Sequence, residues 1–496
     1  MSRIASASPN AWSQPRRALP LLALWLLATL GLRPLLVPDE GRYATVARDM
    51  LLQGDGLVPL LNGLPFFHKP PLMYWLDMAA MALVGVNAFS ARIAPFAGAF
   101  AMGAAVLLAA RRWHGERAGA AALLVLATMP FFYVGGQYAN LDMLVGGMIA
   151  ATVLAFVRAA EAPSLCWVLG AWALAALSVL AKGLIGLVLP ALVVGPWLLA
   201  QRRWRDLLRL LHPLGLAVFA ALALPWFVLM QQRYPGFFDY FVMEQHFRRF
   251  VQTNFNNAHR GWFYLAVLPA LTLPWSAWLP AALADAWRER APAERAQLAL
   301  YGWWIVAVVG FFSLPTSKLV GYVLPALAPC ALLIGLALAR RPRALRWTLA
   351  IGASVCLGAV AVLALKSPHS SRPAALVLGA QIKPGDRVVF VDEMFYDLPF
   401  YAGLREPVIV ASDWADPDLA RRDNWRKELF DAARFDPPRA KQLLWPLARI
   451  GELACHPQAV WFVVRPGNES RLSGLGLEKV HADREVVLWR SAPRPC

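Results

Sequence analysis

Long apolar segments separated by short polar connections dominate the first three quarters of the chain. Several of these segments approach or exceed the roughly 20 residues that an α-helix needs to cross a bilayer. The pattern predicts membrane-spanning helices near residues 18–37, 88–110, 118–135, 141–158, 165–181, 183–200, 209–230, 261–283, 298–314, 318–339 and 345–365. Residues 71–86 are apolar too, and we interpret them as a juxtamembrane helix or as one of an additional pair of spans. The expected architecture is an α-helical bundle with 11 to 13 transmembrane helices.

Residues 366–496 follow a different pattern, without any long apolar run. Three segments rich in β-branched and aromatic residues predict strands at 387–392, 459–464 and 485–489, and helical stretches fall between them over 417–453. We therefore expect two domains, a transmembrane domain over 1–365 and a small α/β domain over 366–496.

The first polar connection, residues 38–87, has a local order of its own. Apolar side chains recur there at helical spacing, and polar side chains occupy the opposite face (Tyr43, Val46, Ala47, Met50 and Leu51 against Arg42, Thr45, Arg48 and Asp49). This spacing predicts a short amphipathic helix in the membrane interface, which Gly54-Asp55-Gly56 ends. An extended segment over 57–67 follows, and Pro70 then restricts the backbone of Lys69.

Composition and charge support a polytopic membrane protein. Of the 496 residues, 58% are hydrophobic and only 16% are charged. Nearly all of the net charge of +17 belongs to residues 1–365, which carry +15. The basic excess therefore favours a role in membrane topology and in contact with anionic lipid, and it argues against nucleic-acid binding.

Basic clusters set the expected topology. If the N-terminus is cytoplasmic, every arginine cluster between the predicted spans also falls on the cytoplasmic side (Arg111, Arg112, Arg117; Arg202, Arg203, Arg205, Arg209; Arg288, Arg290, Arg295; Arg340, Arg341, Arg343, Arg346). No small-residue cleavage pattern follows the first apolar segment, so we interpret it as an uncleaved span and not as a signal peptide. The opposite face then carries residues 38–87, the corner at 137–142, the connection at 231–260, residues 315–318 and the C-terminal domain.

The candidate functional residues are expected on that opposite face. They comprise Asp39, Glu40, Arg42, His68, Lys69, Asp142, Lys182, Arg248, Arg249, His259, Lys318 and Tyr322. Most of these residues have an ordinary explanation as well: Lys182 can extend to the headgroups, His259 can be an interfacial polar residue, and Arg248 and Arg249 can anchor lipid phosphates. An acid inside an apolar span, such as Asp142, has to face protein or a water-filled cavity.

Carboxylates and cations together at a membrane face suit one reaction in particular. Cations bind a lipid phosphate, and carboxylates stabilise a developing oxocarbenium ion or remove a proton from an acceptor. Glycosyl transfer from a polyprenyl-phosphate sugar uses both. The sequence has no Gly-rich phosphate loop of the kind that binds a nucleotide sugar.

At these residues the sequence also resembles a family. The segments PDEGRYA, GDG, FFHKPPLMYW, LAKGLIGLVLP (180–190), HFRRF, LPW (273–275) and PTSKLVGYVLP (315–325) are similar to those of the bacterial lipid A aminoarabinose transferases. This is glycosyltransferase family 83, in the C-type superfamily that includes the protein O-mannosyltransferases. The resemblance extends over residues 18–365, and family members also carry a periplasmic α/β domain.

The resemblance implies an inner-membrane enzyme with a cytoplasmic N-terminus, which transfers a sugar from undecaprenyl phosphate to a lipid A phosphate with inversion. Asp39 would be the reactive carboxylate, with Glu40 beside it, and Arg42 would orient these acids or a phosphate. Lys69, Arg248 or Arg249, Lys318 and Tyr322 would hold the carrier phosphate, while Asp142, Lys182 and His259 would face the cavity. The family has Glu where this chain has His68 before Lys69-Pro70, so His68 is a candidate ligand for a divalent metal ion.

Two alternatives stay open at this stage. One is the same lipid-linked donor chemistry with another sugar or acceptor, such as a glycan, a protein or another lipid. The other is a polyprenyl-lipid transporter, although transporters are expected to show inverted repeats and charges near mid-bilayer. Cys455 and Cys496 could pair if the C-terminal domain lies in an oxidising compartment.

Overall fold

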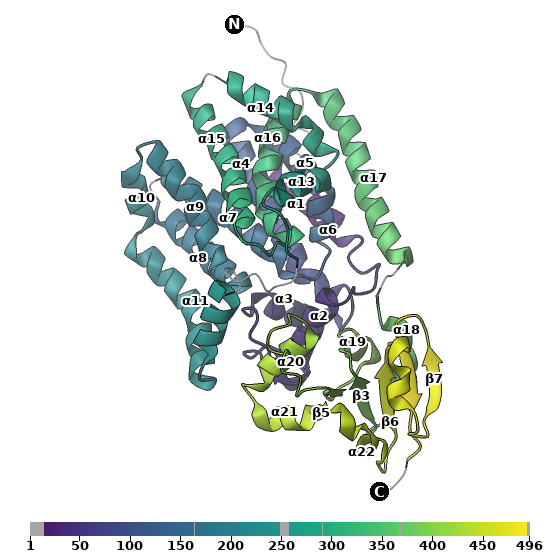
Figure 1. Cartoon of the computed structure of the whole chain (residues 1–496). Helices are drawn as coiled ribbons and strands as arrows, with labels where there is room; N and C mark the ends of the chain where they lie inside the picture. Colours follow the sequence, from purple (N-terminus) through teal and green to yellow (C-terminus); the bar gives the residue numbers. More distant parts are fainter. Residues whose placement is uncertain (1–13, 163, 249–256, 290, 367–368, 494–496) are drawn as a thin grey trace. The chain divides into compact units, whose positions relative to one another are not determined.

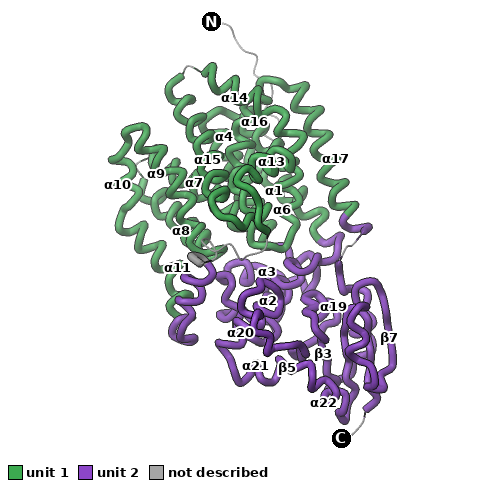
Figure 2. The backbone as a smooth tube through the Cα atoms, viewed as in Figure 1, with its two compact units in different colours: residues 1–30, 94–229, 257–362 green, residues 31–93, 230–256, 363–496 purple. Residues whose placement is uncertain are grey.

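The computed structural model describes residues 14–162, 164–248, 257–289, 291–366 and 369–493 (Figure 1). Contacts divide the chain into two compact units (Figure 2). Unit 1 comprises residues 1–30, 94–229 and 257–362, and unit 2 comprises residues 31–93, 230–256 and 363–496. The first connection therefore belongs to the same unit as the C-terminal residues, whereas the sequence suggested a single boundary after residue 365.

Unit 1 is built from helices throughout its described residues. They are α1 (Pro15–Leu27), α4 (Ile93–His114), α5 (Glu116–Ala127), α6 (Pro130–Gly135), α7 (Leu141–Glu161), α8 (Leu165–Lys182), α9 (Ile185–Ala200), α10 (Trp204–Leu210), α11 (Pro213–Arg233), α13 (Phe263–Leu271), η4 (Trp275–Trp278), α14 (Leu279–Arg288), α15 (Pro292–Ser313), η5 (Val320–Ala326), α16 (Leu327–Ala339) and α17 (Pro342–Lys366). α4 begins one residue before the limit of the unit, and α11 and α17 each end four residues beyond it.

The helices confirm a multi-pass membrane protein. Within the described residues, seven helical segments are long and apolar enough to cross a bilayer, and an eighth is a pair bent by 103° between Phe263–Leu271 and Trp275–Arg288. The spans predicted near 18–37, 118–135 and 183–200 form helices of 13, 12 and 16 residues. These are shorter than the roughly 20 residues that a straight bilayer crossing requires.

Small residues allow close helix packing inside unit 1. A Cβ placed on Gly98 of α4 would lie 2.4 Å from the Cα of Leu144 on α7. A Cβ placed on Gly147 of α7 would lie 1.9 Å from the carbonyl oxygen of Gly98. The backbones of α4 and α7 therefore approach each other through paired glycines, as is common between membrane helices.

Unit 2 begins with the predicted amphipathic helix. α2 (Asp39–Gln53) ends at Gly54, whose φ of 69° is left-handed, and this confirms both the helix and its stop signal. The face predicted to be polar is nevertheless buried: the Thr45 hydroxyl donates a 2.6 Å hydrogen bond to the carbonyl oxygen of Tyr396. The pattern located the helix correctly, but it could not show that residues of the C-terminal region cover its second face.

The rest of the first connection packs on the C-terminal residues. Strands β1 (Leu60–Leu61) and β2 (Leu64–Pro65) form a hairpin, and α3 (Leu72–Val84) and η2 (Ser90–Arg92) follow. The Asn62 side chain donates to the Val408 carbonyl at 2.9 Å and accepts from the Val408 N–H at 2.8 Å. Leu64 joins a small buried cluster with Ala432, Ala440 and Leu443. Later in the chain, unit 2 also contains a π-helical segment, η3 (Asp239–Arg248).

The C-terminal part is the expected α/β domain. Its six-stranded sheet has the order β5-β4-β3-β6-β8-β7. β5, β4, β3 and β6 are parallel, and β8 is antiparallel to both of its neighbours, β6 and β7. The strands are β3 (Arg387–Val391), β4 (Ile409–Ser412), β5 (Leu444–Pro446), β6 (Val460–Val464), β7 (Glu478–Ala482) and β8 (Val487–Arg490). The helices are α18 (Arg372–Gln381), α19 (Leu398–Ala402), α20 (Trp425–Ala433), α21 (Pro437–Leu443), η6 (Leu447–Arg449), α22 (Ile450–Ala454) and η7 (Pro466–Leu472).

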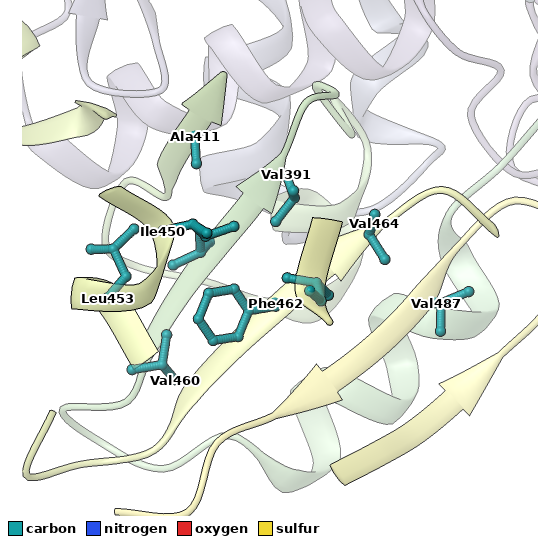
Figure 3. Close-up of a cluster of buried hydrophobic side chains, with 10 residues drawn as sticks. Val391, Ala411, Ile450, Leu453, Val460, Phe462, Val464 and Val487 are labelled. Carbon is teal, nitrogen blue, oxygen red and sulfur yellow. The ribbon is translucent and has the colours of Figure 1, made fainter. Parts of the chain in front are cut away.

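Three of these strands, β3, β6 and β8, were predicted from the sequence, and three were missed. β5 is three residues long and contains Pro446, and β7 carries Glu478, Lys479 and His481. Both are edge strands, where polar residues and proline are tolerated and the apolar signal is weak. The core lies on the central strands, with Val391, Phe462 and Val464 packed near Ile450 and Leu453 (Figure 3).

Candidate functional site

Glu40, predicted as a catalytic acid, lies fully buried in unit 2. One oxygen accepts 3.0 and 2.9 Å hydrogen bonds from Arg33 and Arg92, and the other forms a close ion pair with Arg33 and accepts from the Leu36 N–H at 2.9 Å. Burial raises the pKa of the Glu40 carboxyl, but the charges of Arg92 and Arg33 outweigh that effect and hold it at about 2. Glu40 is therefore an ionised anchor that joins three segments of unit 2.

The neighbouring acid, Asp39, has a different environment. Its side chain is 34% exposed and pairs with Arg42 at 2.5 Å, one helical turn further along α2. Arg42 also forms a close ion pair with Glu428 of α20 and lies 4.9 Å from the ring centroid of Tyr43. Because two carboxylates hold the Arg42 guanidinium, the geometry favours orientation of Asp39 over direct phosphate binding by Arg42.

Glu428 and Tyr396 complete this cluster, and the sequence did not point to either. The Tyr396 hydroxyl donates a 2.6 Å hydrogen bond to Glu428. Burial raises the pKa of the Glu428 carboxyl, and the positive charge of Arg42 opposes that rise. No local motif marks Glu428. In contrast, Arg33 and Arg92 lie within predicted apolar spans, and charged residues in such spans were a signal that could have identified the Glu40 anchor.

The backbone in front of this cluster is tightly packed. A Cβ placed on Gly41 would lie 3.0 Å from the Asp397 nitrogen and 3.0 Å from a Val37 methyl group. Glycine between Glu40 and Arg42 therefore lets the first turn of α2 approach the start of α19. This is a structural reason for the glycine in the PDEGRY segment.

His68 and Lys69 follow Phe67, which is buried in an aromatic cluster. The Phe67 ring lies 5.0 Å from Phe237 and 4.9 Å from Phe435. The His68 ring stacks on Phe66 at 4.4 Å and lies 5.9 Å from Tyr240. Lys69 is half-buried. Buried aromatic rings thus fix the chain on which these two side chains are carried.

The described residues around His68 do not include a set of metal ligands. Among the described residues, no group of three or more His, Cys, Asp or Glu side chains is arranged to hold a metal ion. In the described part of the chain, the His68 ring contacts the rings of Phe66 and Tyr240, and aromatic rings are not the nitrogen, sulfur or carboxylate donors that zinc and similar ions take. The described residues therefore do not fit the predicted divalent metal.

Three predicted residues meet in unit 1. Asp142 and Lys182 form a close ion pair, and the Lys182 ammonium lies 4.6 Å from the ring centroid of Tyr322. Asn140 caps α7 by accepting a 3.0 Å hydrogen bond from the Asp142 N–H. A Cβ on Gly321 would lie 2.1 Å from an Asp142 oxygen, so glycine at that position makes room for the carboxylate.

Lys318 and His259 also lie together in unit 1. The Lys318 ammonium donates a 2.9 Å hydrogen bond to the His259 carbonyl and a 2.5 Å hydrogen bond to the Pro315 carbonyl. The His259 ring stacks on Phe263 at 4.1 Å. Lys318 thus holds two loops together. Arg249 lies outside the described residues, as does the side chain of Arg248.

Comparisons with known proteins extend these observations. Residues 68–229 match the family model for dolichyl-phosphate-mannose-protein mannosyltransferase. An undecaprenyl phosphate-α-4-amino-4-deoxy-L-arabinose arabinosyl transferase of Pseudomonas aeruginosa is 39% identical over 373 residues, which is 72% of this chain and 66% of the relative. A Pseudomonas fluorescens protein of the same name, transferase 2, is 36% identical over 376 residues, which is 72% of this chain and 67% of the relative. The chain thus spans about two thirds of the length of these relatives.

A solved structure shows the same fold. ArnT from Cupriavidus metallidurans bound to undecaprenyl phosphate aligns with a TM-score of 0.83 at 24% identity, over 96% of this chain and 99% of that one. The apo form aligns with a TM-score of 0.80. Fold and sequence place this chain in the class of membrane-embedded glycosyltransferases. Within that class, it belongs to the family of undecaprenyl phosphate-aminoarabinose arabinosyl transferases.

Proposed function

We propose that this protein transfers 4-amino-4-deoxy-L-arabinose from undecaprenyl phosphate to a phosphate group of lipid A, with inversion at C1. The observation that carries the proposal is the 36% identity over two thirds of a relative that is named for this donor. The partly exposed Asp39 carboxylate, which pairs with Arg42 at the start of α2, is the proposed reactive group.

In this mechanism Asp39 stabilises the positive charge that develops on the sugar. A lipid A phosphate is largely ionised at neutral pH, because phosphate monoesters have a second pKa near 6, so it attacks C1 without a general base. The bond between C1 and the carrier phosphate breaks, and undecaprenyl phosphate leaves. Arg42 keeps Asp39 in place, while Glu40 anchors the turn before α2 without touching the substrate.

Cations stabilise the departing phosphate. Lys69, Arg248 or Arg249, and Lys318 are the proposed contacts, and charge-assisted hydrogen bonds of this type contribute roughly 1.5–3 kcal/mol each. Lys182 is already paired with Asp142 and lies against Tyr322. We assign these three residues, together with His259, to the cavity that receives the donor.

The proposed location is the bacterial inner membrane, with a cytoplasmic N-terminus and a periplasmic C-terminal domain. The arginine clusters between the helices support this orientation. Cys455 is disulfide-bonded, as an oxidising compartment permits, and Cys496 lies outside the described residues.

Mass spectrometry of lipid A from cells with and without the protein tests the proposal. We expect a pentosamine-sized mass increment that requires Asp39 and Lys69. Lipid A could be unchanged in these cells although the purified protein still consumes a polyprenyl-phosphate sugar. That result would contradict lipid A as the acceptor and would favour the alternative of another sugar or acceptor. Donor that is not consumed in detergent, where no second compartment exists, would favour transport over transfer.

A further inference from the structure

A groove in the C-terminal domain is lined by residues other than those of the candidate site. It has a volume of about 960 Å³, within the range of small-molecule sites, and it is open to solvent. Asp392 follows β3, Ser412 ends β4 and Pro446 ends β5, and Arg471 lies in η7, beyond β6. The lining therefore comes from the carboxyl ends of three of the four parallel strands and from η7, which follows the fourth.

This position in the sheet is a common place for a ligand. The chain runs from β3 outward to β4 and β5 and then returns to place β6 on the other side of β3. The strand order thus reverses beside β3. In open α/β sheets, ligands bind in the crevice at the carboxyl ends of the strands where the order reverses. The groove lies at that edge.

The backbone at the centre of the groove has an unusual conformation. Asp392 has a φ of 51°, in the left-handed region that residues other than glycine rarely adopt. Its carboxylate accepts a 2.7 Å hydrogen bond from the Ser412 hydroxyl and pairs with Arg471 at 2.8 Å. Such conformations gather at ligand sites, because the surrounding structure has to be built to hold them.

Two indole rings form part of the lining. Trp414 and Trp425 lie edge to face, with centroids 6.1 Å apart and an interplanar angle of 90°. The Trp414 N–H donates to the Val410 carbonyl at 3.2 Å, which fixes the orientation of that ring. Both tryptophans are partly exposed. Oriented, partly exposed indoles offer flat apolar surface to a ligand.

The charges of the lining select the class of ligand. Asp392 and Asp413 balance Arg426 and Arg471, so the groove has no excess charge. The segment after β3 reads VDEMFYD and lacks the glycines that bring backbone N–H groups to a nucleotide phosphate. An uncharged ligand with many hydroxyl groups and a flat apolar face matches both the balanced polar groups and the indoles.

We propose that this groove binds a saccharide, whose ring C–H face packs on Trp414 and Trp425 and whose hydroxyls bond to the side chains around Asp392, Asp413 and Arg426. The lining residues of the groove do not include Asp39, Arg42, Tyr396 or Glu428, and the proposal does not depend on which sugar the enzyme transfers. Such a site makes the C-terminal domain a carbohydrate-binding module of the same chain.

Saturation-transfer difference NMR on the full-length protein in detergent tests this site. The probes are lipid-free core oligosaccharide released from lipopolysaccharide, the same oligosaccharide after dephosphorylation, and a peptidoglycan disaccharide. Sorbitol serves as a polyol without a ring face. We expect saturation of ring C–H protons in at least one oligosaccharide, none in sorbitol, and affinity that falls by roughly tenfold in Trp414→Ala.

Matched variants separate binding from folding. Trp414→Phe keeps an aromatic ring and should retain most of the affinity, and Trp445→Phe changes a tryptophan that does not line the groove. Melting temperatures report folding, and donor consumption reports the catalytic centre independently. Absence of saturation for all three oligosaccharides would overturn the proposal. So would binding that is unchanged in both Trp414→Ala and Trp425→Ala, or binding that requires the phosphates and not the indoles.

Discussion

Unit 1 and unit 2 each bury an acid beside cations, but they surround it differently. In unit 2, Glu40 is wholly buried, and Arg33, Arg92 and a backbone N–H satisfy both of its oxygens. In unit 1, the Asp142 side chain keeps 12% of its exposure and pairs with one lysine, whose ammonium also faces Tyr322. An acid held by two guanidinium groups is fixed in place. A lysine that pairs with an acid can turn to an anionic ligand instead, because its ammonium lies on a flexible side chain.

The same contrast occurs between two consecutive residues. Asp39 and Glu40 lie in the first turn of α2, yet the Asp39 side chain is 34% exposed and that of Glu40 is not exposed at all. A helix turns by about 100° per residue, so neighbours point in different directions. One acid is accessible to solvent, and the other is part of the buried scaffold.

The strongest test of this division is to neutralise the exposed acid. Asp39→Asn should lower transfer by at least roughly 10³-fold, because it removes the charge that stabilises the transition state. Lys69→Ala should likewise abolish detectable transfer. The measurement is single-turnover transfer from a synthetic donor, and melting temperatures should stay near that of the wild type. Asp55→Asn, which changes another acid of the same connection, is the matched control, and normal activity in Asp39→Asn would refute the assignment.

The buried acid should show the reverse behaviour. Glu40→Gln leaves Arg33 and Arg92 buried without their counter-ion, and breaking a buried pair in this way costs about 3–5 kcal/mol of stability. We expect a large drop in melting temperature, or little extractable protein. Glu393→Gln, which breaks the exposed pair with Arg465, should cost less than about 1 kcal/mol. Equal stability of Glu40→Gln and wild type would contradict the role of Glu40 as an anchor.

The unit 1 pair can be examined with a double-mutant cycle. Asp142→Asn and Lys182→Met should each lower the melting temperature, and the double variant should be less destabilised than the sum, with a coupling of roughly 0.5–3 kcal/mol. Donor affinity should fall in both single variants, because Lys182 is assigned to the cavity. Strict additivity of the two changes would show that the ion pair does not couple these residues.

A smaller effect is expected from a third buried acid, Asp397. Burial raises its pKa from 3.8 to about 6, against hydrogen bonds from Ser370 and Ser371. The native state then holds the proton more tightly than the unfolded state, so stability falls as pH rises from about 4 to about 6 and is level above that. Between pH 5 and pH 8, this loss amounts to roughly 1–2 kcal/mol.

Melting temperatures from pH 5 to pH 8 measure the effect. Asp397→Asn should remove this part of the pH dependence and should be more stable than wild type at pH 8. Ser370→Ala, which keeps the carboxyl and removes one of its donors, should preserve the dependence and shift it to higher pH. A pH profile that is identical in wild type and Asp397→Asn would exclude Asp397 as its source.

The sequence determined the features that depend on local pattern. Apolar segment length gave the helical membrane part, periodicity and Gly54 located α2 and its end, and β-branched runs located β3, β6 and β8. The residues of PDEGRY and HKPP pointed to the site because charged groups beside a membrane are costly unless they are paired or functional. These signals lie within short stretches of the sequence, so they can be recognised without a structure.

The tertiary structure decided which of those charges are buried and by what. Glu428 approaches Arg42 from 386 residues further along the chain, and Arg92 reaches Glu40 across 52 residues. Such partners cannot be recognised from the spacing of residues in the sequence. The energy of an ion pair depends on the distance between the charges and on their burial, and not on their separation along the chain. The sequence therefore pointed to two adjacent acids, with Asp39 as the reactive one by resemblance, and only their packing showed that Glu40 is a buried anchor and that Asp39 is partly exposed.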